Sequence, residues 1–234
     1  MKLHTWAVIF LFFVSFGNGA CTTGTGKDSQ KQTTLPGKKI LTLGGTVSEI
    51  VCALGMTEQI IATDRTSVYP ESLQQLPSVG YRTSIKAEGV LSTGADLILA
   101  EADYLNADVA TQLQTAGLAF HPIKNELNLE STKTMIREIA AIVNREPQAR
   151  EVIQTLDKDI QVLTDLLKQA TSKPKVMFVY ARGQGTMSVC GKETFAQSII
   201  ALAGGQLATS EITGYKPLTP EALVAADPDY ILFF

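Results

Sequence analysis

Two segments far apart in the chain contain the same pattern of tyrosine, basic and acidic residues. The first is PSVGYRTSIKAEGVLSTGADLIL, from Pro77 to Leu99, and the second is GYKPLTPEALVAADPDYIL, from Gly214 to Leu232. Each has Gly-Tyr followed by a basic residue, then a Glu, and then an Asp at the same distance from that Glu. Because a repeat decides architecture, this match is the first guide to the fold.

Further matches upstream extend the repeat. The segment KILTL, a glycine-containing loop and EIVCALG correspond, in the same order, to VMFVY, a glycine-containing loop and SIIALAG. The acids of the pattern pair as Glu88 with Asp96 and Glu221 with Asp229. The sequence therefore predicts an internal duplication that forms two similar lobes.

Short apolar segments alternate with helical patterns in each half, which predicts parallel sheets with helices on both faces. We expect an α/β protein: two doubly wound parallel-sheet lobes joined by one long α-helix, with a ligand cleft between the lobes. The linking helix is predicted from the periodic apolar run that follows Pro147. The expected divisions are a signal peptide (1–20), a flexible tether (21–37), an N-terminal lobe (38–124), a connecting helical segment (125–145), the linking helix (146–171) and a C-terminal lobe (172–234).

Several local predictions concern loops and chain ends. Thr46 and Glu49 have the spacing of a capping box that opens a helix. The segment ARGQGTMSVCGKETF after VMFVY is expected to be a loop, and Tyr69 is expected to pack within its own loop. By the repeat, a helix and a further strand should follow DYILFF, so we expect the C-terminal lobe to be incomplete in this sequence.

The N-terminal segment has the features of an export signal. Lys2 and His4 precede an apolar run from Trp6 to Phe16, which is too short to span a bilayer, and small residues then lead to Cys21. Cys directly after Gly-Ala resembles a bacterial lipobox, in which the Cys is acylated, although Asn18 stands where Leu is usual. The alternative is ordinary signal peptidase cleavage close to Cys21.

Composition and missing motifs exclude several functions. A net charge of -3 and a pI near 5.5 make nucleic acid a poor candidate partner. A dinucleotide fingerprint that starts at Gly183 would need Gly where Ser188 stands. After signal removal the only His is His121, inside an apolar strand segment, and no hydrolytic or zinc constellation is present. We therefore do not expect an enzyme.

Taken together, the exported chain, the two lobes and the segments LGGTVSEIVCALG and LPSVGYRTSIKAEGVLSTGADLILA resemble the haem-binding substrate-binding proteins of bacterial ABC importers. These belong to the helix-linked class of periplasmic binding proteins that also carries cobalamin and ferric siderophores. The resemblance extends over residues 38–234. It implies haem b as the transported ligand and a location in the periplasm or cell envelope, where the lipobox-like sequence predicts a lipid anchor at Cys21.

In the family that this chain resembles, the Tyr of the Gly-Tyr motif coordinates haem iron, which corresponds to Tyr81. Phenolate is a hard ligand suited to Fe(III). A phenol is protonated at neutral pH, so the ferric ion and a nearby guanidinium such as Arg82 would have to favour the phenolate. Family members often have this Arg two residues after the Tyr, where this chain has Thr83.

The resemblance also implies contacts from the second lobe. Some relatives place a His on the iron after the strand equivalent to VMFVY, where this chain has Arg182. Since arginine does not ligate iron, we expect Arg182 to pair with a haem propionate. Tyr215 and Met187 are further candidates for the haem-binding cleft.

Glu88 and Glu221 match the acids with which the family docks onto the permease dimer of the importer, which works with an ATPase. The alternative is that each Glu only stabilises the start of a short helix. We expect the protein to be a monomer. For the ligand, cobalamin and a ferric siderophore remain open, and an enzyme acting on tetrapyrroles is a third possibility.

Overall fold

The computed structural model describes residues 37–182 and 185–234. The expected signal peptide, Cys21 and nearly all of the tether lie outside the described residues. Among the helices of the described part, none combines the length and apolar character that crossing a bilayer requires.

The first lobe contains a four-stranded sheet in which all strands are parallel. Its order is β2 (Ile60–Thr63), β1 (Ile40–Leu43), β3 (Leu97–Glu101) and β4 (Ala119–Ile123). Strands β1 and β3 are almost fully buried, as expected for a parallel sheet covered on both faces. The parallel sheet predicted for this half is confirmed.

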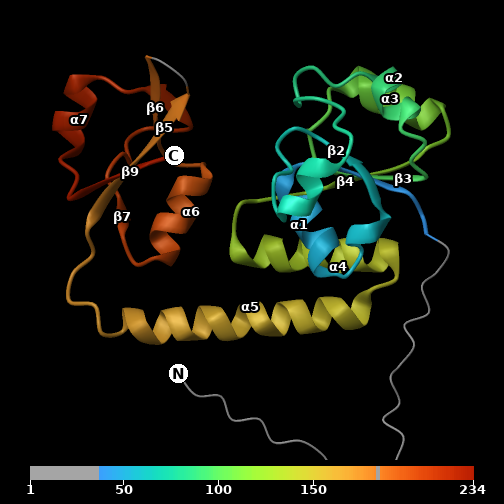
Figure 1. The fold of residues 1–234 in the computed structure, drawn as a ribbon. Coiled ribbons are helices and arrows are strands. Elements are labelled where there is room, and N and C mark those ends of the chain that lie inside the picture. Colours follow the sequence, from blue (N-terminus) through green and yellow to red (C-terminus); the bar gives the residue numbers. More distant parts are fainter. Residues whose placement is uncertain (1–36, 183–184) are drawn as a thin grey trace, which may run out of the picture. The chain divides into compact units, whose positions relative to one another are not determined.

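Helices cover both faces of this sheet (Figure 1). Helices α1 (Gly45–Ala53) and α4 (Leu129–Val143) pack on the face that contains Ile40, Leu97 and Leu99. Helices α2 (Ala87–Ser92) and α3 (Ala107–Thr115) lie side by side on the opposite face. Two short 3₁₀ helices complete the lobe, Thr57–Gln59 and Glu71–Gln75.

The predicted capping box at the start of α1 is wrong. The N-cap is Gly44, at φ 100°, and it has no side chain with which to cap. A Cβ at Gly44 would lie 2.7 Å from Oε1 of Glu101, so the end of β3 closely approaches this helix start. The side chain and backbone N–H of Thr46 hydrogen-bond to Glu101 instead. An acid distant in sequence thus accepts hydrogen bonds from the first turn of the helix.

Along the chain, helix α5 (Glu146–Leu167) follows the first lobe and precedes the second. Ala149 is buried in the core of the first lobe, and Val152, Ile153 and Leu156 pack against that core. Further along the helix Val162 and Leu166 are exposed. The first half of α5 is therefore fixed to the first lobe by apolar contacts.

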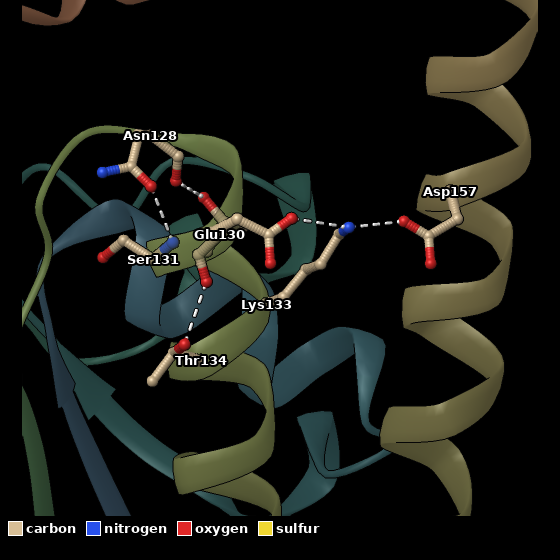
Figure 2. Close-up of polar contacts among 7 residues, drawn as sticks. Asn128, Glu130, Ser131, Lys133, Thr134 and Asp157 are labelled. Atoms are coloured by element: carbon tan, nitrogen blue, oxygen red, sulfur yellow. Dashed lines mark hydrogen bonds and ion pairs between the residues drawn. The ribbon is translucent and has the colours of Figure 1, made fainter.

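An ion-pair cluster also joins α4 to α5 (Figure 2). Lys133 Nζ lies 2.6 Å from Asp157 Oδ1 of α5 and 2.9 Å from Glu130 Oε1 of its own helix. These carboxylates raise the pKa of Lys133, and the hydrogen bond to Asp157 is the larger cause. Asn128 caps α4 by accepting a hydrogen bond from the backbone N–H of Ser131 at 2.8 Å.

The second lobe contains a mixed sheet. Strand β5 (Lys175–Arg182) pairs in parallel with β7 (Gln206–Leu207) and β9 (Tyr230–Phe233). It pairs antiparallel with β6 (Thr186–Cys190), which in turn pairs antiparallel with β8 (Tyr215–Pro217). Helices α6 (Phe195–Leu202) and α7 (Pro220–Ala226) supply apolar side chains to the two clusters that include β5.

The α/β class is therefore confirmed, but two details of the second lobe are corrected. Its sheet is not wholly parallel, and the segment expected to be a loop after β5 contains β6. The sequence TMSVC alternates polar and apolar residues, which suits one strand of a hairpin. The glycines before this strand drew attention to the loop and away from that short alternation.

The repeat is confirmed at the level of single hydrogen bonds. In the first lobe the backbone N–H of Lys39 donates to Asp96 Oδ2 at 3.0 Å. In the second lobe the backbone N–H of Lys175 donates to Asp229 Oδ2 at 2.7 Å. Each Asp thus joins the start of its own strand to the start of the neighbouring one.

Candidate functional site

A buried carboxylate joins three loops at the carboxyl edge of the first sheet. Asp64, directly after β2, accepts hydrogen bonds on Oδ1 from Gly44 N at 3.1 Å and Ser67 Oγ at 2.6 Å. Its Oδ2 accepts from Thr66 N at 2.7 Å and from the hydroxyl of Tyr104. These partners lie in the loops after β1, β2 and β3, so Asp64 fixes the edge at which ligands of parallel sheets bind.

Burial and hydrogen bonding act in opposite directions on Asp64. Burial would raise the pKa of this carboxyl, but hydrogen bonds from Ser67, Thr66 and Tyr104 outweigh it, and the pKa lies below its ordinary value. The pKa of Tyr104 is raised, first by burial and then by its hydrogen bond to Asp64. At neutral pH the pair is therefore a carboxylate and a protonated phenol.

Glu101, at the end of β3, shows the opposite balance. Burial raises the pKa of its carboxyl, and the charge of Asp64 adds to this effect. Hydrogen bonds from Thr46 and the charge of Arg82 act to lower the pKa, without cancelling the increase. Two neighbouring acids at one edge thus have pKa values shifted in opposite directions.

The segment that leads to Tyr81 is attached to the sheet edge by backbone pairing. Thr63 N donates to Pro77 O at 3.0 Å, and Val79 N donates to Thr63 O at 2.9 Å. Arg65 N then donates to Gly80 O at 2.9 Å. The Gly-Tyr pair therefore follows a short extension of the sheet and is not part of an unattached loop.

Tyr81 begins a tight turn. Its carbonyl accepts hydrogen bonds from Ser84 N at 2.7 Å and from Ser84 Oγ at 2.9 Å. The preceding Gly80 has φ 103°, a conformation that other residues rarely adopt, and a Cβ there would lie 3.3 Å from Ser84 Oγ. The glycine of the motif is thus required by the turn that sets the backbone of Tyr81.

Arg82 extends from this turn to the loop after β3. Its Cζ lies 5.3 Å from the centroid of the Tyr104 ring, within the range of a cation–π contact. Its Nη2 donates to the carbonyl of Asp103 at 3.1 Å. The structure therefore brings Arg82 beside Tyr104, whose hydroxyl donates to Asp64. The sequence identified neither Tyr104 nor Asp64 as a site residue.

In the second lobe Tyr215 belongs to an aromatic cluster. Its ring centroid lies 6.4 Å from that of Tyr180, which stacks on Phe234 at 5.8 Å. Phe178 and Phe195 continue the cluster, with their rings edge to face at 5.0 Å. Tyr215 is more than half exposed, so the cluster reaches the surface.

Met187 lies on the other face of the same sheet. Tyr215 of β8 lies directly opposite Cys190 of β6, so these two side chains project to the same face of the sheet. Met187 lies an odd number of residues before Cys190 in β6, so its side chain projects to the opposite face from Tyr215. Arg182 ends β5, opposite Thr186 in the hairpin, but its side chain lies outside the described part of the structure. Tyr215 and Met187 therefore do not share one surface of the second lobe.

Glu88 and Glu221 occupy equivalent positions. Each is the second residue of its short helix, and each is exposed. Hydrogen bonds from its own backbone N–H and from Thr219 lower the pKa of Glu221. Thr219 also caps its helix by accepting from Ala222 N at 3.1 Å.

The prediction for Tyr69 is wrong, since this side chain is 67% exposed. The sequence also missed Asp64, Thr66, Ser67 and Tyr104. A signal was present: the polar segments DRTS and EADY directly follow the buried strands QIIAT and DLILA, where the carboxyl edge of a parallel sheet must lie.

Comparisons with known proteins cover nearly the whole described chain. The sequence model of a family described as Periplasmic binding protein matches residues 40–233. The uncharacterized ABC transporter substrate-binding lipoprotein YvrC of Bacillus subtilis is 24% identical over 198 residues, which are 83% of this chain and 63% of that protein. The vitamin B12-binding protein of Yersinia pestis is 24% identical over 176 residues, 74% of this chain and 61% of that protein. The chain thus spans about three fifths of the length of these relatives.

Solved structures are similar over most of the chain. The periplasmic heme-binding protein RhuT from Roseiflexus sp. RS-1, in apo form, has a TM-score of 0.80 and 30% identity, covering 84% of this chain and 76% of RhuT. The periplasmic heme-binding protein BhuT, in complex with two hemes, has a TM-score of 0.78 and 31% identity, covering 83% of this chain and 75% of BhuT.

Proposed function

The chain belongs to the periplasmic binding protein family, and on this premise we propose that it captures haem outside the cytoplasm and delivers it to an ABC importer. Proteins of this family are substrate-binding components of transport systems and not enzymes. The ligand proposed is haem b, held in a cleft between the two lobes. Acylation of Cys21 would anchor the protein to the membrane.

The observation that carries the haem proposal is the similarity to heme-binding proteins at 30% and 31% identity. The geometry of the Gly-Tyr turn supports it. Tyr81 lies in a turn whose backbone is fixed at the carboxyl edge of the first sheet, and Arg82 follows it directly. A fixed backbone reduces the ordering cost of ligand binding.

The proposed chemistry assigns Tyr81 as the ligand of ferric iron, through its phenolate oxygen. The guanidinium of Arg82 would favour the phenolate or pair with a haem propionate, since guanidinium groups bind carboxylates well. Arg182 would bind a propionate from the second lobe. Tyr215 and its aromatic cluster would offer a surface to the planar macrocycle, while Met187, on the other sheet face, is a weaker candidate.

Cobalamin is the second candidate ligand, because the Yersinia pestis relative is a vitamin B12-binding protein. A corrin site has no need of a phenolate ligand to iron. The role of Tyr81 therefore separates the two candidates. A ferric siderophore would favour several basic residues and no axial tyrosine.

The test is a titration of the purified mature protein with hemin and, separately, with cyanocobalamin. We expect a high-spin ferric spectrum of the phenolate type with hemin, and its loss in Tyr81→Phe, which keeps the ring but removes the ligating oxygen. Tyr230→Phe, on an exposed strand residue, is the matched control and should keep the wild-type spectrum. If the protein binds cyanocobalamin and does not bind hemin, the haem proposal is rejected in favour of a corrin ligand.

Glu88 and Glu221 are proposed to dock onto the permease dimer that acts with an ATPase. Their equivalent positions in α2 and α7 support this, because two acids related by a repeat suit a symmetric partner. Both are exposed, as a docking residue requires.

A further inference from the structure

We propose that Tyr104 is a positioning residue that holds the Arg82 guanidinium at the carboxyl edge of the first lobe, ready to receive a carboxylate of the ligand. The ligand step rests on the proposed function. The positioning of Arg82 by Tyr104 does not, because it concerns contacts within the first lobe alone.

The contact between the two residues is specific. The Cζ of Arg82 lies 5.3 Å from the centroid of the Tyr104 ring, and Nη2 donates to the carbonyl of the adjacent Asp103 at 3.1 Å. Arg82 is otherwise exposed, and an exposed arginine samples many rotamers. Two contacts from one loop restrict the guanidinium to a single region.

Tyr104 is itself held firmly. It is only 7% exposed, its hydroxyl donates to Asp64, and Thr66 Oγ1 lies 2.9 Å from that hydroxyl. Its backbone N–H donates to Glu101 O at 3.1 Å at the end of β3. The ring that faces Arg82 is therefore part of the rigid sheet edge.

The chain of contacts runs from Asp64 through Tyr104 to Arg82. A guanidinium placed before the ligand arrives loses less conformational entropy on binding a carboxylate. The arrangement also explains how Arg82, directly after Tyr81 in the sequence, can be placed to bind a carboxylate of the ligand. Its long side chain is directed to the loop after β3, where the tyrosine ring holds it.

A ligand-free measurement tests the positioning first. In wild type, the side-chain NMR resonances of Arg82 should show an upfield ring-current shift from Tyr104. The shift should persist in Tyr104→Phe, which keeps the ring, and disappear in Tyr104→Leu. Absence of the shift in wild type, or its persistence in Tyr104→Leu, would overturn the proposal whatever the ligand is.

Hemin titrations then test the ligand step. We expect Tyr104→Leu to weaken binding about two- to fivefold, the size of an exposed cation–π contact, and Tyr104→Phe to have a smaller effect. In an Arg82→Gln background, Tyr104→Leu should cause no further loss, because it acts through Arg82. Additive losses in the double variant would refute the assignment.

Ser48→Ala is the control for general damage. Ser48 Oγ donates to Thr42 Oγ1 at 2.8 Å and lies 2.6 Å from Ser67 Oγ, so it belongs to the same buried network without touching Arg82. It should lower stability and leave hemin affinity unchanged. If wild type binds no hemin, the proposed function fails, while the NMR result still decides the role of Tyr104.

Discussion

At the scale of single residues, Asp64 and Glu101 are neighbouring acids with opposite pKa shifts. Asp64 receives hydrogen bonds from hydroxyls and backbone N–H groups, which favour its charged form. Glu101 is partly buried, and its burial together with the nearby charge of Asp64 disfavours a second charged carboxylate. The surroundings at this edge therefore favour the charged form of Asp64 and disfavour that of Glu101.

This difference predicts opposite pH dependence for two variants. Since the folded pKa of Asp64 is lowered, its stabilisation is present above the unfolded value and is lost as pH falls through the folded pKa. Asp64→Asn should therefore cost about 2–3 kcal/mol at pH 7 and less as the solution becomes acidic. Urea denaturation at pH 7 and at about pH 3, below the ordinary pKa of an Asp carboxyl, would measure this trend.

For Glu101 the sign is reversed. Its folded pKa is raised, so wild type loses stability as pH rises through that value, and Glu101→Gln removes the loss. The free energy of unfolding of Glu101→Gln minus that of wild type should therefore be higher at pH 7 than near pH 4. We expect the increase to be about 1 kcal/mol or less. If both variants follow the same trend with pH, the assignment of the two acids is wrong.

At the scale of elements, α5 divides into two parts. Its first half contributes Ala149 to the first-lobe core, with Val152, Ile153 and Leu156 against it, and the ion pair of Lys133 with Asp157 lies nearby. The Lys133 side chain is only 13% exposed and that of Asp157 is 52% exposed, so this ion pair adds to the apolar contacts that fix this half of the helix. The Leu166 side chain, by contrast, is 61% exposed.

Truncating one leucine in each half tests this division. Leu156→Ala should lower the free energy of unfolding by about 1–2 kcal/mol, because the side chain is only partly buried. Leu166→Ala, the matched control on the same helix, should change it by less than about 0.5 kcal/mol. Equal losses in urea denaturation would contradict the division of α5.

At the scale of the whole molecule, the same residue positions recur in both lobes. The matched hydrogen bonds of Asp96 and Asp229, and the matched positions of Glu88 and Glu221, express the same repeat in both lobes. This recurrence is the basis of the proposed docking of Glu88 and Glu221 onto a symmetric partner.

Charge reversal tests the docking role. The double variant Glu88→Lys/Glu221→Lys should reduce stimulation of the importer ATPase about tenfold or more, since lysines would repel the basic permease surface that the docking proposal requires. Its affinity for hemin should equal that of wild type, because both residues lie on helices outside the Tyr81 turn. Undiminished stimulation would exclude these acids as docking residues.

The sequence by itself determined the α/β class, the duplication and the place of the Gly-Tyr turn. Alternation of strands and helices and repeated spacing are properties of local segments, so they are visible along the chain. The expected capping box failed because Gly44 and Glu101, which are distant in sequence, meet only when β1 and β3 pair.

Only the tertiary structure decided what surrounds the candidate site. The contacts among Asp64, Tyr104 and Arg82 depend on three loops that meet at one edge, and the opposite faces of Met187 and Tyr215 depend on the register of β6 with β8. Hydrogen bonding between strands sets both arrangements, and no local spacing records them. The sequence could therefore name Tyr81 and Arg82, but it could not show which residues hold Arg82 in place.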